Sequence, residues 1–136
     1  MHPAKTMHPA KNRAGRSLLC CAAIWLCAAI GNAQVDLKAD AVVYFGSACN
    51  TSAPATIDEQ KVREATPEWQ TILTDGVRRG TARYLLLTAE MDKRIRDASQ
   101  KAAASLSKDL VVRSGDILNA NGKAATDLTA TVIANL

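Results

Sequence analysis

The sequence predicts an α+β fold, and three observations indicate it. Apolar residues recur at helical spacing over about 67–107, β-favouring runs lie on both sides of that segment, and a last apolar stretch follows Asp127. The expected order of elements is therefore a strand, a helical excursion, a strand hairpin and a short C-terminal helix.

Residues 1–33 are predicted to be a secretory signal peptide. Basic residues without any acid precede an unbroken apolar run over 18–30, and small residues occupy 31–33, where a signal peptidase cleaves. The run is shorter than the roughly 20 residues that a membrane-spanning helix needs. We therefore expect a single exported domain at 34–136, with translation starting at Met1 or Met7.

The exported domain has few residues suited to catalysis or metal binding. All 13 acidic residues lie in it, but both histidines, His2 and His8, lie before it, and Cys49 is its single cysteine. A nucleophile activated by histidine, a zinc site built from His and Cys, and an intramolecular disulfide are therefore excluded within one chain. We expect no cofactor and no metal, and Cys49 is a buried small hydrophobe, a free thiol or an intermolecular bridge.

Paired carboxylates are the remaining candidates for acid–base chemistry. Asp58 and Glu59 are adjacent, and Glu64 and Glu68 are four residues apart. Adjacent side chains usually point apart, and carboxylates at the edge of a helix usually face solvent. The sequence therefore predicts a protein that is not an enzyme and has no catalytic residue.

Local signals predict the elements that precede the helical excursion. Residues 42–45 form a β-favouring run, 46–54 have the composition of a loop, and 56–62 are either a second strand or the approach to a helix. Thr66 is a predicted N-cap, with Pro67 at the first helical position.

The helical excursion divides into two predicted helices. Glycines over 75–81 interrupt it, and Thr81 is placed to cap a restart that runs from Ala82 to about Leu106. The first helix has one apolar face, and the second has a narrow apolar seam suited to packing against another helix, as in a coiled coil. The apolar face consists of Trp69, Ile72, Leu73 and Val77, and the seam of Leu87, Met91, Ile95, Ala98, Ala102 and Leu106. The residues predicted to serve helix packing or oligomerisation are Trp69, Leu87, Met91 and Ile95.

Beyond residue 108 the pattern changes to strands. Two β-favouring runs, at 109–113 and 116–118, flank Ser114-Gly115, which predicts a hairpin with a tight turn. Asp127 is the predicted N-cap of a terminal helix, whose apolar face consists of Leu128, Val132, Ile133 and Leu136.

Charged residues are unevenly distributed along the exported domain. Residues 34–68 contain twice as many acids as bases, whereas 69–101 carry a basic excess. A solvated helix face explains this pattern, and so does attraction to an anionic membrane surface or to acidic client segments. The charge excess of the whole chain lies in residues 1–33, so no nucleic-acid partner is expected. The predicted contacts to clients or to a membrane are Arg78, Arg79, Arg83 and Arg94.

Several segments, in this order, resemble the Skp/OmpH family of periplasmic chaperones. Residues 57–62 (IDEQKV), followed by Thr66-Pro67-Glu68, resemble the opening of that family, and residues 109–113 (DLVVR) resemble its return strand. The match covers roughly residues 56–136. The segment that resembles the closing helix consists of Asp127-Leu128-Thr129, Val132-Ile133 and Leu136.

The resemblance implies a small β-sheet body with an inserted helical arm or hairpin, and a homo-oligomer, a trimer in the family, that holds unfolded or outer-membrane proteins. Only roughly 40 residues separate the two end motifs, so a hairpin arm reaches at most about 30 Å at 1.5 Å per residue. We expect a short chaperone-like holdase that binds clients through helix faces and charge. The alternative is a non-catalytic envelope adaptor or structural protein of the same fold without chaperone activity.

Overall fold

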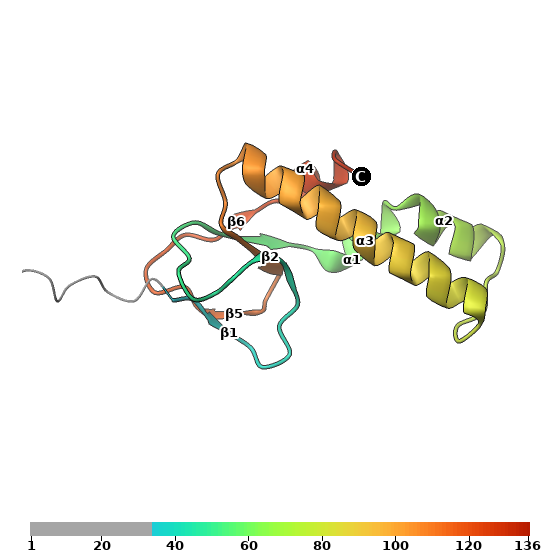
Figure 1. Cartoon of the computed structure of the whole chain (residues 1–136), viewed down its shortest axis with the longest axis horizontal. Helices are drawn as coiled ribbons and strands as arrows, with labels where there is room; N and C mark the ends of the chain where they lie inside the picture. The colour runs from blue at the N-terminus through green and yellow to red at the C-terminus, as the bar shows by residue number, and fades with distance from the viewer. Residues whose placement is uncertain (1–33) are drawn as a thin grey trace, which may run out of the picture. The chain divides into compact units, whose positions relative to one another are not determined.

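The computed structural model describes residues 34–136, and the predicted signal peptide at 1–33 lies outside them. The described part has six strands and four helices, so its fold is α+β, as the sequence predicts (Figure 1). The strands are β1 (Asp36–Leu37), β2 (Val43–Gly46), β3 (Pro54–Ile57), β4 (Leu110–Arg113), β5 (Ile117–Asn119) and β6 (Thr126–Asp127). The helices are α1 (Glu59–Glu64), α2 (Pro67–Thr74), α3 (Ala82–Ser105) and α4 (Thr129–Ile133).

β4 has a neighbour on each side in a four-stranded sheet. The strand order is β2-β4-β3-β6, with β2 antiparallel to β4 and with β3 parallel to both of its neighbours. Parallel neighbours need a long crossover connection, and the helical segment between β3 and β4 provides it. Because β4 is covered on both edges and both faces, Leu110, Val111 and Val112 are fully buried.

β5 does not pair with β4, so the predicted hairpin is wrong. Ser114 and Gly115 do form a turn, but β5 pairs with β1 in a separate two-stranded sheet. The physical reason is a second apolar cluster, in which Ile117 finds its packing partners. That cluster consists of the buried Val35, Leu110 and Val112, with Leu37, Val43 and Ile117 packed against them.

The helices between β3 and β4 form a hairpin. α1 and α2 make the outgoing arm, and α2 lies alongside the first part of α3, which returns to the sheet (Figure 1). The glycine-containing break at 75–81 is the turn of this hairpin. The returning arm is the longer one, because the 24 residues of α3 continue past α2 to contact β2 and β4.

Helix starts follow the capping signals in two of three predicted cases. The Thr66 hydroxyl accepts a hydrogen bond from the Trp69 amide at 3.3 Å, and Thr81 accepts one from the Tyr84 amide at 3.2 Å. The prediction for α4 is wrong, because Leu128 occupies its N-cap and Asp127 ends β6. The Asp127 carboxylate still accepts the Thr129 amide at 2.9 Å, so it binds one of the free amides of that helix.

The main core lies where α3 crosses the four-stranded sheet. Four residues of the predicted seam are at most 1% exposed, but Leu106 is 46% exposed. The seam therefore packs against strands as well as helices, whereas the sequence favoured packing against another helix. This core consists of Ala55, Ile57 and Val111 from the sheet, Met91, Ile95, Ala98, Ala102 and Ala103 from α3, and Val62, Leu128 and Val132.

None of the helices within residues 34–136 combines the length and the apolar character that a membrane span requires.

Candidate functional site

The outer end of the helical hairpin, residues 73–86, is called the hairpin tip. Three contacts give its loop a defined conformation. The Val77 amide donates to the Ile72 carbonyl oxygen at 3.0 Å where α2 ends, and the Thr81 hydroxyl donates to the Arg78 carbonyl oxygen at 2.8 Å where α3 begins. An ion pair between Arg83 and Asp75 joins the two ends of the loop.

Three leucines at the hairpin tip are exposed to solvent. Leu73 is 59% exposed, Leu85 61% and Leu86 65%. The expected burial of Leu73 on the apolar face of the first helix is therefore wrong, because α3 covers α2 on one side only. Val77 lies beyond the end of α2.

The sequence contained a signal for the exposed leucines that the periodicity argument missed. Residues 85–87 are three leucines in a row, and successive residues of a helix point in directions about 100° apart. A narrow seam can bury one of them, and Leu87 is the half-buried one.

Two arginines of the hairpin tip have unpaired charges. Arg78 and Arg79 are exposed, and neither forms a salt bridge within residues 34–136. Arg83, by contrast, is paired with Asp75. The hairpin tip therefore presents apolar and cationic groups together.

Arg94 lies outside the hairpin tip and holds elements together. Its guanidinium forms hydrogen bonds with both carboxylate oxygens of Glu68, the shortest at 2.7 Å, and with the Leu136 carbonyl oxygen at 3.3 Å. The hydrogen bonds and the charge of Glu68 raise the pKa of Arg94. Glu68 is only 6% exposed, which corrects the expectation that this carboxylate faces solvent. Arg94 therefore fastens α2 to α3 and to the end of the chain.

Three of the four residues proposed for helix packing or oligomerisation contribute to the main core of the chain. Met91 and Ile95 are buried in the main core, and Trp69 is half-buried and packed against it. Leu87 is half-buried on α3. Met91 and Ile95 already contact other elements of the same chain, so they are not available to a second copy.

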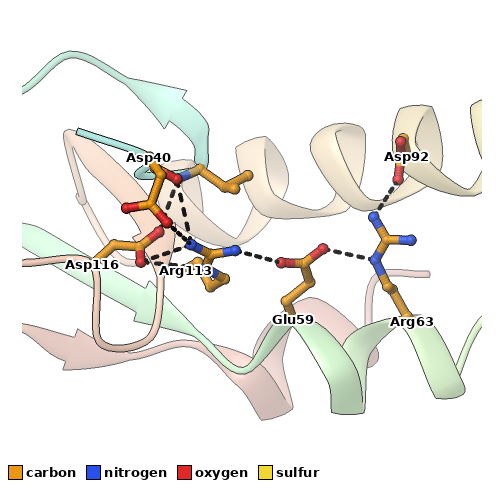
Figure 2. A network of polar contacts seen from close by, with 7 residues as sticks. Asp40, Glu59, Arg63, Asp92, Arg113 and Asp116 are labelled. Atoms are coloured by element: carbon orange, nitrogen blue, oxygen red, sulfur yellow. Dashed lines mark hydrogen bonds and ion pairs between the residues drawn. The ribbon is translucent and has the colours of Figure 1, made fainter. Parts of the chain in front are cut away.

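A network of ion pairs connects the sheet to the hairpin (Figure 2). Arg113, at the end of β4, contacts Asp116 at 3.0 Å and Glu59 at 3.8 Å. Glu59 contacts Arg63 at 2.8 Å on α1, and Arg63 contacts Asp92 at 3.0 Å on α3. The network therefore links β4, α1 and α3. The i,i+4 spacing of Glu59 and Arg63 is a sequence signal for their pairing. No spacing in the sequence indicates the contacts of Arg63 with Asp92 and of Arg113 with Glu59.

Asp116 is the buried member of this network. Its carboxylate accepts the Val42 amide at 2.8 Å, and its side chain is 3% exposed. Burial raises the pKa of Asp116, but the Val42 hydrogen bond and the Arg113 guanidinium outweigh burial and lower it below its usual range. Asp116 therefore stays ionised beside Arg113.

Tyr44 borders the network from β2. Its hydroxyl is buried without a hydrogen-bond partner within the described residues. Burial, followed by the negative charge of Glu59, raises the pKa of Tyr44. The phenol therefore stays neutral.

Cys49 lies in the loop after β2 and is exposed. The alternative in which it is a buried small hydrophobe is wrong, which leaves a free thiol or an intermolecular bridge. Among residues 34–136, no group of three or more His, Cys, Asp or Glu side chains is arranged to hold a metal ion.

Comparison of the chain with protein-family models, with curated proteins and with solved structures finds no match.

Proposed function

We propose that this protein is an exported, chaperone-like holdase that binds unfolded or outer-membrane proteins through its hairpin tip. The observation that carries the proposal is the exposure of Leu73, Leu85 and Leu86 beside two unpaired arginines. Exposed leucines bind apolar segments of an unfolded chain, and cations attract acidic segments. The proposed location is the periplasm.

The order of the elements supports the family resemblance on which the proposal also rests. A strand leads into a helical hairpin, a parallel return strand follows, and a short helix closes the chain. The segment that resembles the family's opening, 57–62, begins at the last residue of β3 and continues into α1, and the segment that resembles the return strand, 109–113, contains β4. The two segments meet where Ile57 pairs with Arg113. We propose by the same resemblance that the protein forms a homo-oligomer, a trimer in the family, which would place several tips around one client.

The test is suppression of client aggregation, followed by light scattering. An unfolded outer-membrane protein is diluted from denaturant in the presence of the purified protein, at low and at high salt. We expect suppression that weakens at high salt, because added salt screens exposed charges. A stable monomer without effect on aggregation contradicts the proposal.

Matched variants connect any activity to the hairpin tip. Leu86→Ser changes a 65% exposed leucine at the tip, and Leu118→Ser changes a 66% exposed leucine on β5. We expect Leu86→Ser to reduce suppression at least severalfold and Leu118→Ser to leave it unchanged. Equal effects of the two variants would remove the tip from the mechanism.

The arginines are tested in the same way. Arg78→Ser with Arg79→Ser removes the two unpaired cations, whereas Lys38→Ser with Lys101→Ser removes two exposed cations elsewhere. Only the first double variant is expected to reduce suppression and its dependence on salt. An identical response of both pairs would reduce the role of these arginines to solubility.

The second candidate is an envelope adaptor of the same fold without holdase activity. The short outgoing arm favours it, because α1 and α2 comprise 6 and 8 residues and reach only about 20 Å at 1.5 Å per residue. Arms of this length enclose little volume, which suits a folded partner better than an unfolded one. Absence of suppression together with capture of one folded envelope protein would support the adaptor.

A further inference from the structure

A cavity at the base of the hairpin has no role in the proposed function. Its volume is about 460 Å³, within the range of small-molecule sites. It lies where β3, α1, α2 and the end of β4 meet. The lining residues are Asp58, Glu59, Gln60, Arg63, Glu64, Trp69, Arg113 and Ser114.

The two arginines of the cavity are already neutralised by carboxylates. Arg113 contacts Asp116 and Glu59, and Arg63 contacts Glu59 and Asp92. An anionic ligand would have to compete with these ion pairs. The cavity is therefore poorly suited to bind a phosphate or a carboxylate.

Glu64 is the carboxylate of the cavity without a cationic partner. It accepts a hydrogen bond from the Gln60 side-chain amide at 2.9 Å, and it forms no salt bridge within residues 34–136. The other acidic lining residues differ, since Asp58 pairs with Lys61 and Glu59 pairs with Arg63. The carboxylate of the cavity that is free to pair with a cation is therefore Glu64, which is exposed.

Trp69 supplies the second recognition element. It is half-buried, lines the cavity and lies in the first turn of α2, whereas Glu64 ends α1. The Thr66 cap and the packing of Trp69 against the main core hold it in place. An indole favours a cation near its face, and a planar guanidinium stacks on an aromatic ring and also pairs with a carboxylate. An indole and an unpaired carboxylate in one cavity therefore match an arginine side chain.

We propose that this cavity binds the guanidinium group of an arginine side chain in an extended client segment, with Trp69 stacking on it and Glu64 pairing with it. The inference deepens the proposed function and rests on it for the source of the arginine. It gives the protein two contacts with a client: apolar segments at the hairpin tip and a basic residue at the hairpin base.

The test uses the fluorescence of Trp69 in the full chain, with Trp25→Phe to remove the other tryptophan. A blocked peptide Ala-Arg-Ala is titrated into the protein, and so, separately, is the same peptide with citrulline in place of arginine. Citrulline keeps the shape of arginine without its charge. We expect a saturable change in fluorescence with arginine and at least fivefold weaker binding with citrulline. Equal binding of the two peptides overturns the proposal.

Carboxylate variants locate the binding. Glu64→Gln is expected to weaken binding of the arginine peptide about fivefold. Glu90→Gln changes an exposed carboxylate on α3 outside this cavity and is expected to leave binding unchanged. Both side chains are exposed, so both variants are expected to fold. An unchanged affinity in Glu64→Gln overturns the assignment.

Two further experiments distinguish the possible sources of the guanidinium group and distinguish this inference from the proposed holdase function. Ethylguanidinium that binds as tightly as the peptide would overturn the assignment to a client chain. Aggregation suppression is measured on the same preparations. If the protein suppresses aggregation but does not bind the arginine peptide, the inference alone is overturned. If it binds the arginine peptide through Glu64 but does not suppress aggregation, the holdase function is overturned and the cavity remains a peptide site.

Discussion

At the scale of single residues, Gly46 limits how closely two segments approach. It ends β2 with φ of +81°, and a β-carbon on it would collide with the carbonyl oxygen of Asp109 just before β4. Gly115 has nearly the same φ, +83°, but has open space where its β-carbon would lie. Substitutions at the two glycines therefore distinguish the free-energy cost of a left-handed conformation from the additional cost of a steric collision.

Gly46→Ala is expected to destabilise the protein much more than Gly115→Ala. The second change costs about 1–2 kcal/mol from backbone conformation alone. The first adds displacement of β4 from β2, and we expect a total loss above about 3 kcal/mol. Urea unfolding followed by circular dichroism measures both, and similar losses for the two variants would show that the sheet accommodates the extra atom.

Ser107 adopts a left-handed conformation without being a glycine. Its φ is +52°, and the Lys108 amide donates to the Ala103 carbonyl oxygen at 2.8 Å, the hydrogen bond that ends a helix in a Schellman motif. We expect Ser107→Gly to stabilise the protein by about 0.5–1 kcal/mol, because glycine adopts this conformation without steric strain. The measurement is the urea concentration at the midpoint of unfolding, with the dependence of the free energy of unfolding on urea concentration unchanged.

Ser105→Gly is the control for Ser107, since Ser105 is the last residue of α3. It introduces the same residue into helical backbone and is expected to lower stability by about 0.5 kcal/mol. Two changes of the same sign would contradict the proposed origin of the gain.

At the scale of elements, the contact of Glu68 with Arg94 connects α2 to α3. The two side chains are 26 positions apart in sequence, and the carboxylate is buried while the guanidinium is partly exposed. Removing the guanidinium would leave a buried carboxylate without its partner, which is more unfavourable than removing both groups.

A double-mutant cycle tests this contact. Glu68→Ala and Arg94→Ala are each expected to lower the urea midpoint, and the double variant is expected to lose less than the two single losses combined. A cycle of Lys93 and Asp97, an exposed pair on α3 with a contact of 2.9 Å, is the control and is expected to show little coupling. Additive losses for Glu68 and Arg94 would mean that packing, not the ion pair, fastens α2.

Elements whose signals lie within a few neighbouring residues were predictable from the sequence. Thr66 and Thr81 cap α2 and α3 as expected, because a cap depends on a hydroxyl and an amide three residues further on. The partner of β5 was not predictable from the turn before it, because the apolar cluster around Val35 decided the pairing. The pairing of Glu68 with Arg94 depends in the same way on how α2 docks on α3.

The candidate site was predictable only in part. Arg78 and Arg79 lie at the hairpin tip, where a basic run beside helix-breaking glycines favours exposure. Arg94 has the same charge and was grouped with them, but the structure places it against Glu68. Composition reports charge, whereas the availability of that charge depends on contacts that form only in the folded chain.

At the scale of the whole described molecule, hydrogen-bonded carboxylates link the segments that the sequence separates. Asp116 joins the loop before β2 to the end of β4, and Asp109 accepts the Ser52 hydroxyl at 2.7 Å and the Ala53 amide at 3.0 Å. Asp127 accepts the Thr129 amide at the start of α4. In each case amide or hydroxyl donors stabilise the charged carboxylate, so that acid should weaken the connections between sheet, loops and helices together.

The pKa directions of these groups predict how stability depends on pH. Hydrogen bonds lower the pKa of Asp127, and they do so for Asp109 and Asp116 against the opposing effect of burial. A carboxylate with a lowered folded-state pKa contributes stability above its unfolded pKa, about 3.9, and loses it as the pH falls through the folded value. Residues 34–136 contain no histidine, the side chain that ordinarily titrates between pH 5 and 8. We therefore expect a free energy of unfolding that is nearly constant from pH 5 to 8 and falls below about pH 4.

Asp116→Asn should change that profile in a specific way. At pH 7 it weakens the contact with Arg113 and is expected to lower stability by about 1–3 kcal/mol. The difference from the unchanged protein should shrink as the pH falls toward 2, because protonation of Asp116 removes the charge that the variant lacks. Asp36→Asn, an exposed change in β1, is the control and should leave the profile as it is. Urea unfolding at each pH is the measurement. It is repeated with His2→Gln and His8→Gln, which remove the two histidines that precede residues 34–136. A constant difference between Asp116→Asn and the unchanged protein from pH 7 to pH 2 would show that the shape of the side chain, not its charge, holds the loop to β4.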